Sequence, residues 1–192
     1  MTIEDCFFRT KDDCLAFKGN DGYGMRNCEN ITVSRTCLWS DECCAVLLGD
    51  ESRARAMRNI TIKDSHVLYL SFEGYPKKFL MLHSGERMRM ENIRLENIDI
   101  HGEGQNRNLV EMSCEFNQYS KEKSPGSISN ILLKNVNVTG KVGPYRILMQ
   151  GFDKQYGIDG VAFENFTVNG NPITEQSPNL QIGKFSNNIT FK

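Results

Sequence analysis

The sequence lacks long apolar runs, an excess of charge of either sign and a cysteine framework. None of its apolar runs approaches the roughly 18 residues that a membrane span needs, so we expect no membrane association. The 23 basic and 24 acidic residues nearly balance, which gives no electrostatic reason to expect a nucleic acid as partner. The seven cysteines contain no C-x-x-C pair, so neither a zinc site nor a disulfide scaffold is expected. Residues 1–5 lack the basic start and apolar stretch of a signal peptide.

What the sequence does contain is a bent motif that recurs along the chain. Each copy reads apolar-x-apolar, a two-residue corner, and apolar-x-apolar again. Alternation with period two indicates β-strands, and the corners carry mostly Asn or Asp, which favour turns. The copies begin at residues 1, 31, 60, 93, 131, 161 and 189. The corner residues are Asp5, Arg35, Asp64, Asn97, Asn135 and Asn165.

The spacing of the copies predicts the fold. Successive copies are 30, 29, 33, 38, 30 and 28 residues apart, and a further strand-like run lies between them, as at 45–48 and 79–82. A parallel β-helix explains a constant strand motif with a drifting period, because loops of different lengths leave between strands that stack in register. A leucine-rich repeat would need a shorter, stricter period, and an antiparallel sandwich would not repeat one bent motif in the same order. We therefore predict a single all-β domain over residues 1–192, with three parallel sheets and about six to seven coils.

The two ends of the chain differ. Met1 occupies an apolar, inward-facing position of the repeat, with no capping segment before it. Residues 169–172 interrupt the repeat, and one last strand follows them. We expect residues 1–192 to be the C-terminal portion of a longer β-helix, with 169–192 as its end coil. A signal peptide would then lie upstream, so we expect a secreted or periplasmic parent protein. The open first coil would offer a surface for self-association.

Two adjacent carboxylates, Asp12 and Asp13, open the strand-like run 14–17. Glycoside hydrolysis uses one carboxylic acid to protonate the leaving oxygen and one carboxylate to activate water or attack carbon. Neighbouring residues on a strand point to opposite faces, so both can reach a cleft only from the turn before the strand. From the spacing alone, an Asp pair that merely caps backbone amides at a corner is the favoured explanation.

Further polar residues flank the corresponding strands of the next coils. Stacked strands lie about 5 Å apart, so these residues could form a line that grips a sugar chain. Trp39 could stack on a sugar ring or serve as half-buried packing, and each charged residue alone is more often a solvated loop residue. The candidate substrate-binding residues are Lys18, Trp39, Asp41, Glu42, Glu51 and His83, with Glu86 close to His83.

The D-D-C-L-A-F run of residues 12–17, set within stacked N-I-T-apolar coils, resembles the paired-aspartate motif of glycoside hydrolase family 28, the polygalacturonase group. The resemblance implies a right-handed, single-stranded parallel β-helix of the pectin-lyase-like type. It also implies that Asp12 and Asp13 form the acid and base pair of an inverting hydrolysis of a polysaccharide. No metal and no organic cofactor are implied. The runs 38–41 and 49–51 are similar to bacterial members of unassigned specificity.

The chain departs from the family pattern at three places. The family's third aspartate comes from the preceding coil, which lies outside this chain. Residues 41–43 stand where Gly-His-Gly is expected, and 80–83 replace Arg-x-Lys. These departures favour a second class, a non-catalytic carbohydrate-binding or adhesion β-helix, and we expect no turnover from residues 1–192 alone. A polysaccharide lyase would want calcium carboxylates and a basic residue, for which Lys18 alone is well placed.

Overall fold

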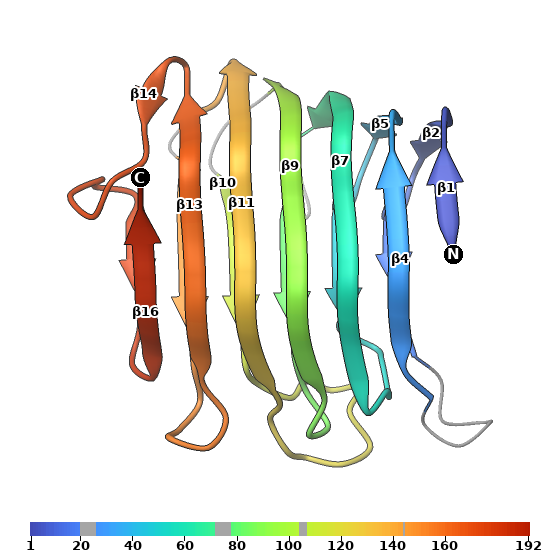
Figure 1. Cartoon of the computed structure of the whole chain (residues 1–192), viewed down its shortest axis with the longest axis vertical. Helices are drawn as coiled ribbons and strands as arrows, with labels where there is room; N and C mark the ends of the chain where they lie inside the picture. Colours follow the sequence, from blue (N-terminus) through green and yellow to red (C-terminus); the bar gives the residue numbers. More distant parts are fainter. Residues whose placement is uncertain (20–25, 72–77, 104–106, 144) are drawn as a thin grey trace.

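The chain winds into a right-handed β-helix. The computed structural model describes residues 1–19, 26–71, 78–103, 107–143 and 145–192, and every regular element in these ranges is a β-strand. In Figure 1 the front strands point upward, the strands behind them point downward, and the chain advances from right to left, which is a right-handed path. The predicted all-β parallel β-helix is confirmed, with about six turns. No helix in the described ranges is long and apolar enough to cross a membrane.

The longer sheet forms one side of the coil and bends around it. Its main path is β1 (Thr2–Glu4), β4 (Cys28–Ser34), β7 (Ala56–Ser71), β9 (Arg89–Glu103), β11 (Ser127–Gly140), β13 (Ile158–Val168) and β14 (Asn171–Pro172), joined by β2 (Phe7–Thr10), β5 (Cys37–Ser40) and β16 (Ser186–Phe191). Its strands pair in parallel except for β13 with β14. The sequence predicted two short strands at each corner, but β7, β9, β11 and β13 run through the corner as single strands. Two of the three predicted sheets are therefore one continuous, bent sheet.

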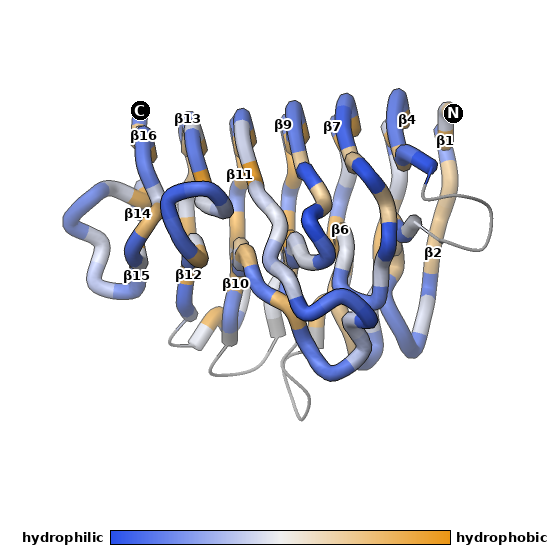
Figure 2. The backbone as a smooth tube through the Cα atoms, turned by 90° about the horizontal axis from the view of Figure 1, so that it is seen from below, coloured by the Kyte–Doolittle hydropathy of each residue, from blue (hydrophilic) through white to orange (hydrophobic). Residues whose placement is uncertain are grey.

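The second sheet closes the coil on the opposite side. It contains β15 (Leu180–Ile182), β12 (Tyr145–Gln150), β10 (Arg107–Ser113), β8 (Leu80–His83), β6 (Val46–Gly49) and β3 (Leu15–Phe17), in that order, and all of these neighbours are parallel. Viewed from below in Figure 2, the turns that join the coils are largely hydrophilic. Polar turns on an apolar wall place any binding surface at the corners or on an outer sheet face.

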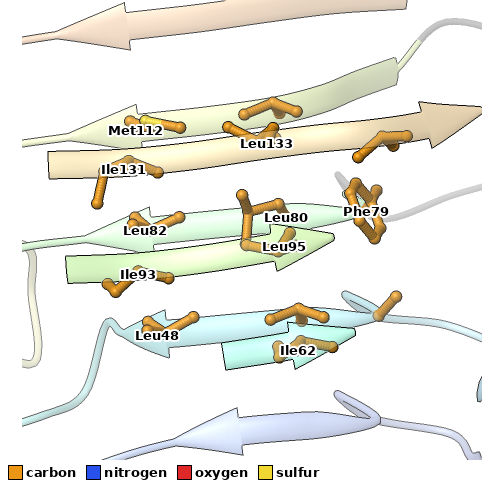
Figure 3. Packing of buried hydrophobic residues seen from close by; sticks show 14 of the residues in the cluster. Leu48, Ile62, Phe79, Leu80, Leu82, Ile93, Leu95, Met112, Ile131 and Leu133 are labelled. Atoms are coloured by element: carbon orange, nitrogen blue, oxygen red, sulfur yellow. The ribbon is translucent and has the colours of Figure 1, made fainter. Parts of the chain in front are cut away.

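The interior is a stack of like residues. Ile31, Ile60, Ile93 and Ile131 are register partners on successive strands, as the repeat predicted. Figure 3 shows Leu80 and Leu82 of β8 packed beside Leu95 and Ile93 of β9, so both sheets share one core. Each such buried side chain contributes roughly 1.5–3 kcal/mol.

The corners explain the recurring Asn and Asp residues. All six predicted corner residues have φ between 51° and 56°, the left-handed region that Asn and Asp tolerate better than other non-glycine residues. The side-chain amides also bond from coil to coil. Asn97 donates to Asp64 at 2.7 Å, Asn135 donates to Asn97 at 2.8 Å, and Asn165 donates to Asn135 at 3.0 Å. Backbone geometry and a side-chain ladder therefore select the same residue type.

Candidate functional site

The paired aspartates lie where both side chains can reach one side of the coil. Asp12 and Asp13 form part of the turn before β3, rather than the strand itself. Oxygen atoms of the two carboxyl groups and the Cys43 sulfur lie within 4.8 Å of one another. The turn thus removes the objection that neighbours on a strand point to opposite faces.

Asp13 is held by the next coil. Its Oδ1 accepts a 3.0 Å hydrogen bond from the backbone N–H of Cys44, and its own N–H donates to Asp12 Oδ1 at 2.8 Å. Partial burial raises the pKa of Asp13, and the negative charge of Asp12 adds to that rise. The Cys44 N–H and the Lys18 charge oppose the rise. Asp13 therefore has the environment of a carboxylic acid that can keep its proton, beside the exposed Asp12.

A groove of about 230 Å³ runs from this pair along the outer face of the second sheet. Its middle is lined by Leu47 and Met81, which are register partners on β6 and β8. The carboxyl groups of Asp12 and Asp13 lie at one end, and this apolar stretch separates them from the polar residues at the other end. An apolar floor with a few polar groups at its ends is the usual composition of a small-ligand site.

The far end of the groove contains Lys18, Asp50 and Glu51. Lys18 Nζ lies 3.3 Å from Glu51 Oε2, and both side chains are partly exposed. Asp50 Oδ1 lies 2.9 Å from His83 Nδ1, and the hydrogen bond with His83 is the main cause that lowers the pKa of Asp50. His83 itself is buried behind Asp50 and is not among the residues that line the groove.

Besides His83, three more of the predicted binding residues lie outside the groove: Trp39, Asp41 and Glu42. The Trp39 ring is stacked on Tyr69, with ring centroids 4.9 Å apart, and Arg9 lies 5.1 Å from the Trp39 ring centroid. Since Arg9 and Tyr69 are the register partners of Trp39 on opposite sides, both faces of the indole are covered. The indole N–H donates to Asp41 Oδ1 at 2.8 Å, which lowers the pKa of Asp41. Glu42 is exposed and does not line the groove.

A loop that the sequence did not reveal completes the site. The segment 114–126 follows β10 and reaches back, so that Asn117 donates to Asp50 Oδ1 at 2.5 Å and Tyr119 lines the groove. Glu86 anchors the loop, because its carboxylate accepts the backbone N–H groups of Lys121 and Glu122 and pairs with Arg53. The signal in the sequence was the longest step of the repeat, 38 residues between 93 and 131.

The loop also bounds a second hollow. This hollow of about 200 Å³ shares Glu51 and Tyr119 with the groove and continues past them to Ser52 and Lys121. The two hollows together extend the surface available to a chain-like ligand.

The cysteine beside the pair is a weak metal ligand. Burial, together with Asp12, raises the pKa of Cys43 to about 11, and burial raises that of Cys44 to about 12. A thiol binds metal as the thiolate, so a cation would have to displace a tightly held proton. Among the residues that the structure describes, Asp12, Asp13 and Cys43 form the group that could hold a divalent ion, but this chemistry does not favour it. All seven cysteines carry free thiols.

Comparison of the chain with protein-family models, with curated proteins and with solved structures gave no match. The function is therefore argued from the groove, because a fold alone does not determine an activity. A larger hollow of about 430 Å³ lies at the last coil, between Phe166, Ile173 and Phe191. None of the predicted site residues lines that hollow.

Proposed function

We propose that the groove binds a polysaccharide or oligosaccharide and that Asp13 and Asp12 hydrolyse a glycosidic bond within it. The observation that carries this proposal is the pair itself: a half-buried Asp13 with a raised pKa lies beside an exposed Asp12 at the end of an apolar-floored groove. Two carboxyl groups in contrasting environments are the arrangement that acid and base roles require.

In this mechanism Asp13 donates its proton to the leaving glycosidic oxygen as the bond to the anomeric carbon breaks. Asp12 removes a proton from a water molecule that attacks the same carbon, so the pair ends with the proton moved from Asp13 to Asp12. Exchange with solvent restores both groups. The Leu47 and Met81 floor would support the apolar face of a sugar ring, while Lys18 and Tyr119 would bond its hydroxyl groups.

The separation of the two carboxyl groups makes the stereochemistry testable. Inverting enzymes keep them roughly 6.5–9.5 Å apart to admit the attacking water. The nearest oxygens of Asp12 and Asp13 lie within 4.8 Å, so inversion requires Asp12 to turn away as substrate and water enter. Asp12 is exposed, and in turning away it gives up the hydrogen bond from the Asp13 N–H. Proton NMR of the first-formed anomer distinguishes inversion from retention.

The second candidate function is a non-catalytic carbohydrate-binding or adhesion β-helix. One contact favours it: the bond from the Cys44 N–H to Asp13 is also what a carboxylate that only caps a corner would make. The groove would then hold a glycan without cleaving it.

The deciding experiment measures reducing ends released from a panel of polysaccharides by the full-length protein. We expect D13N to lower release by about 10²–10⁴-fold, the usual contribution of a general acid. The exposed Glu175, at the last coil, supplies the charge-matched control E175Q, which should keep full activity. Equal release by the unmodified protein and D13N would remove Asp13 from the mechanism. Tight glycan binding without release by either would establish the binding module instead.

A further inference from the structure

We propose that the groove selects an uncharged sugar chain over a uronate chain, and that Asp50 is the specificity-determining residue. This inference rests on the proposed function, because it assumes that the groove holds a glycan. It names the substrate class within that function. It depends on the charges that line the groove and on the way Asp50 is fixed.

The charges that line the groove are predominantly negative. Four carboxyl groups face it, those of Asp12, Asp13, Asp50 and Glu51. Among the described residues that line it, Lys18 is the cation, and Lys18 is already paired with Glu51 at 3.3 Å. A uronate carboxylate would therefore meet an excess of like charge and would have to share Lys18 with Glu51. The hydroxyl groups of a neutral sugar, in contrast, are donors that carboxylates accept.

A further cation close to the groove, Lys78, does not change this balance. Lys78, in the turn before β8, has its Nζ 3.1 Å from Glu111 Oε2, and the two side chains are 8% and 14% exposed. A buried lysine engaged with its own carboxylate is not free to bind a second one, because separating the pair would leave a buried charge uncompensated.

Asp50 is fixed more firmly than the other carboxylates. It follows Gly49, whose φ of 95° and close approach to the His83 carbonyl leave no room for a side chain. Asp50 Oδ1 receives two hydrogen bonds, from His83 Nδ1 at 2.9 Å and Asn117 Nδ2 at 2.5 Å. Within the described part of the chain, Oδ2 takes part in no hydrogen bond. One oxygen is thus locked from behind, while the other remains an acceptor for a ligand.

The position of Asp50 makes it act on a different sugar ring from the catalytic pair. Asp13 bonds the backbone of Cys44, just before β6, and Asp50 directly follows the last residue of β6. At roughly 3.3 Å per residue, the four residues of β6 separate the two ends of the groove by about 13 Å. A sugar chain would lie along the strand, with one ring at the Asp pair and another beside Asp50.

The test uses ligand pairs that differ in charge alone or nearly so. Methyl-esterified and unesterified oligogalacturonides form one pair, and cello-oligosaccharides with their C6-oxidised counterparts form the other. Isothermal titration of the 192-residue chain gives the ratio of affinities within each pair. We expect the neutral member of a binding pair to be favoured about tenfold or more at low salt, as like charges at short range predict. The ratio should shrink as sodium chloride is raised, because screening weakens the repulsion.

Variants then assign the effect to Asp50. D50N keeps the Oδ1 acceptor for His83 and Asn117 and replaces the second oxygen by an NH2 group. It should therefore reduce the ratio of neutral to uronate affinity severalfold. E175Q, which removes an exposed charge on the last coil, should leave the ratio unchanged. Thermal melting confirms that both variants are folded.

Each outcome bears on a different part of the proposal. A uronate member that binds as tightly as its neutral partner, or a ratio that does not respond to salt in the unmodified protein, would overturn the selectivity. A folded D50N with an unchanged ratio would remove Asp50 from that role and leave the glycan groove standing. Absence of binding by every glycan of a broad panel would remove the proposed function and this inference with it.

Discussion

The Asp13 carboxylate accepts a 3.0 Å hydrogen bond from the backbone N–H of Cys44, which belongs to the following coil. The candidate acid is therefore positioned by the stacking of two coils, and not by its own turn alone. Any change that shifts the register between β3 and β6 would move Asp13 relative to the groove. The stability of the stacked sheets and the geometry of the site are therefore coupled at this contact.

Replacement of Asp13 by Asn should reveal its raised pKa as a change in thermal stability with pH. Because the folded-state pKa lies above 3.8, the folded protein binds more protons than the unfolded chain between that value and the raised pKa. Stability therefore falls as pH rises through this window, and the loss persists above it. D13N removes the desolvated charge, so its melting temperature should exceed that of the unmodified protein more at pH 7 than at pH 3.5. A constant difference at the two pH values would contradict this.

The activity expected of the groove should depend on pH in the same sense. A general acid works while protonated, so release of reducing ends should decline as pH rises through the raised pKa of Asp13. The measurement is the initial rate against pH at saturating polysaccharide. A rate that continues to rise from acidic to neutral pH would exclude Asp13 as the acid.

A leucine in the core and a leucine on the surface should respond differently to truncation. Leu82 is 0% exposed between the two sheets, and Leu82→Ala should lower the free energy of unfolding by about 2–5 kcal/mol. Leu68 is 43% exposed on β7, and Leu68→Ala should stay within about 0.5 kcal/mol of the unmodified protein. Urea denaturation gives both values. Similar losses for the two variants would place Leu82 outside the core.

Substitution of the corner residue Asn97 should destabilise the protein through both its backbone conformation and its side-chain bonds. Its φ is 56°, and its amide takes part in the ladder with Asp64 and Asn135. Asn97→Ala should lower the free energy of unfolding by about 1–2 kcal/mol, the approximate penalty for the left-handed region. Asn97→Gly should lose less, because glycine adopts this conformation readily.

Asn137 supplies the control for the corner experiment. It also bonds its neighbours in adjacent coils, Asp99 at 3.4 Å and Thr167 at 3.0 Å, but it is not among the residues with positive φ. Asn137→Ala should therefore be milder than Asn97→Ala. Equal losses would mean that the ladder bonds, and not the backbone, account for the Asn residues at corners.

Glu86 should control the loop that carries Tyr119. Its side chain is 4% exposed, pairs with Arg53 and accepts backbone N–H groups of the loop. Glu86→Gln should destabilise the protein by roughly 3 kcal/mol, near the low end for a broken buried pair, because Arg53 keeps some contact with water. Limited proteolysis should then cut within 115–125. Glu122→Gln breaks only the exposed 3.6 Å pair with Arg87 and should change stability by less than about 1 kcal/mol.

Most of the fold could be predicted from the sequence repeat. Inward positions such as Ile60 and Ile93 can be read from alternation, and corners such as Asn97 from residue type, because both depend on local geometry that recurs in each coil. The number of sheets was wrong by one. Whether a backbone bends at a corner without interrupting its hydrogen bonds depends on its neighbours, and the residue pattern does not encode that.

The candidate site was predicted less completely than the β-helix fold. Asp12, Asp13, Lys18 and Glu51 do line one groove, whereas Trp39 is sandwiched between side chains of adjacent coils. The contribution of Tyr119 could not be read from the sequence, since it depends on the path of a long loop that returns to an earlier coil.

The continuity of the wall across coils of unequal length bears on how such proteins diversify. Register between neighbours survives an insertion of several residues, because the insertion leaves at a corner and not within a strand. Homologous proteins could therefore differ in one inserted loop, such as 114–126, and in ligand preference, while the stacked coils keep the same register. Grafting that loop onto an unrelated solenoid would need counterparts of Glu86 and Asp50, which bond it here.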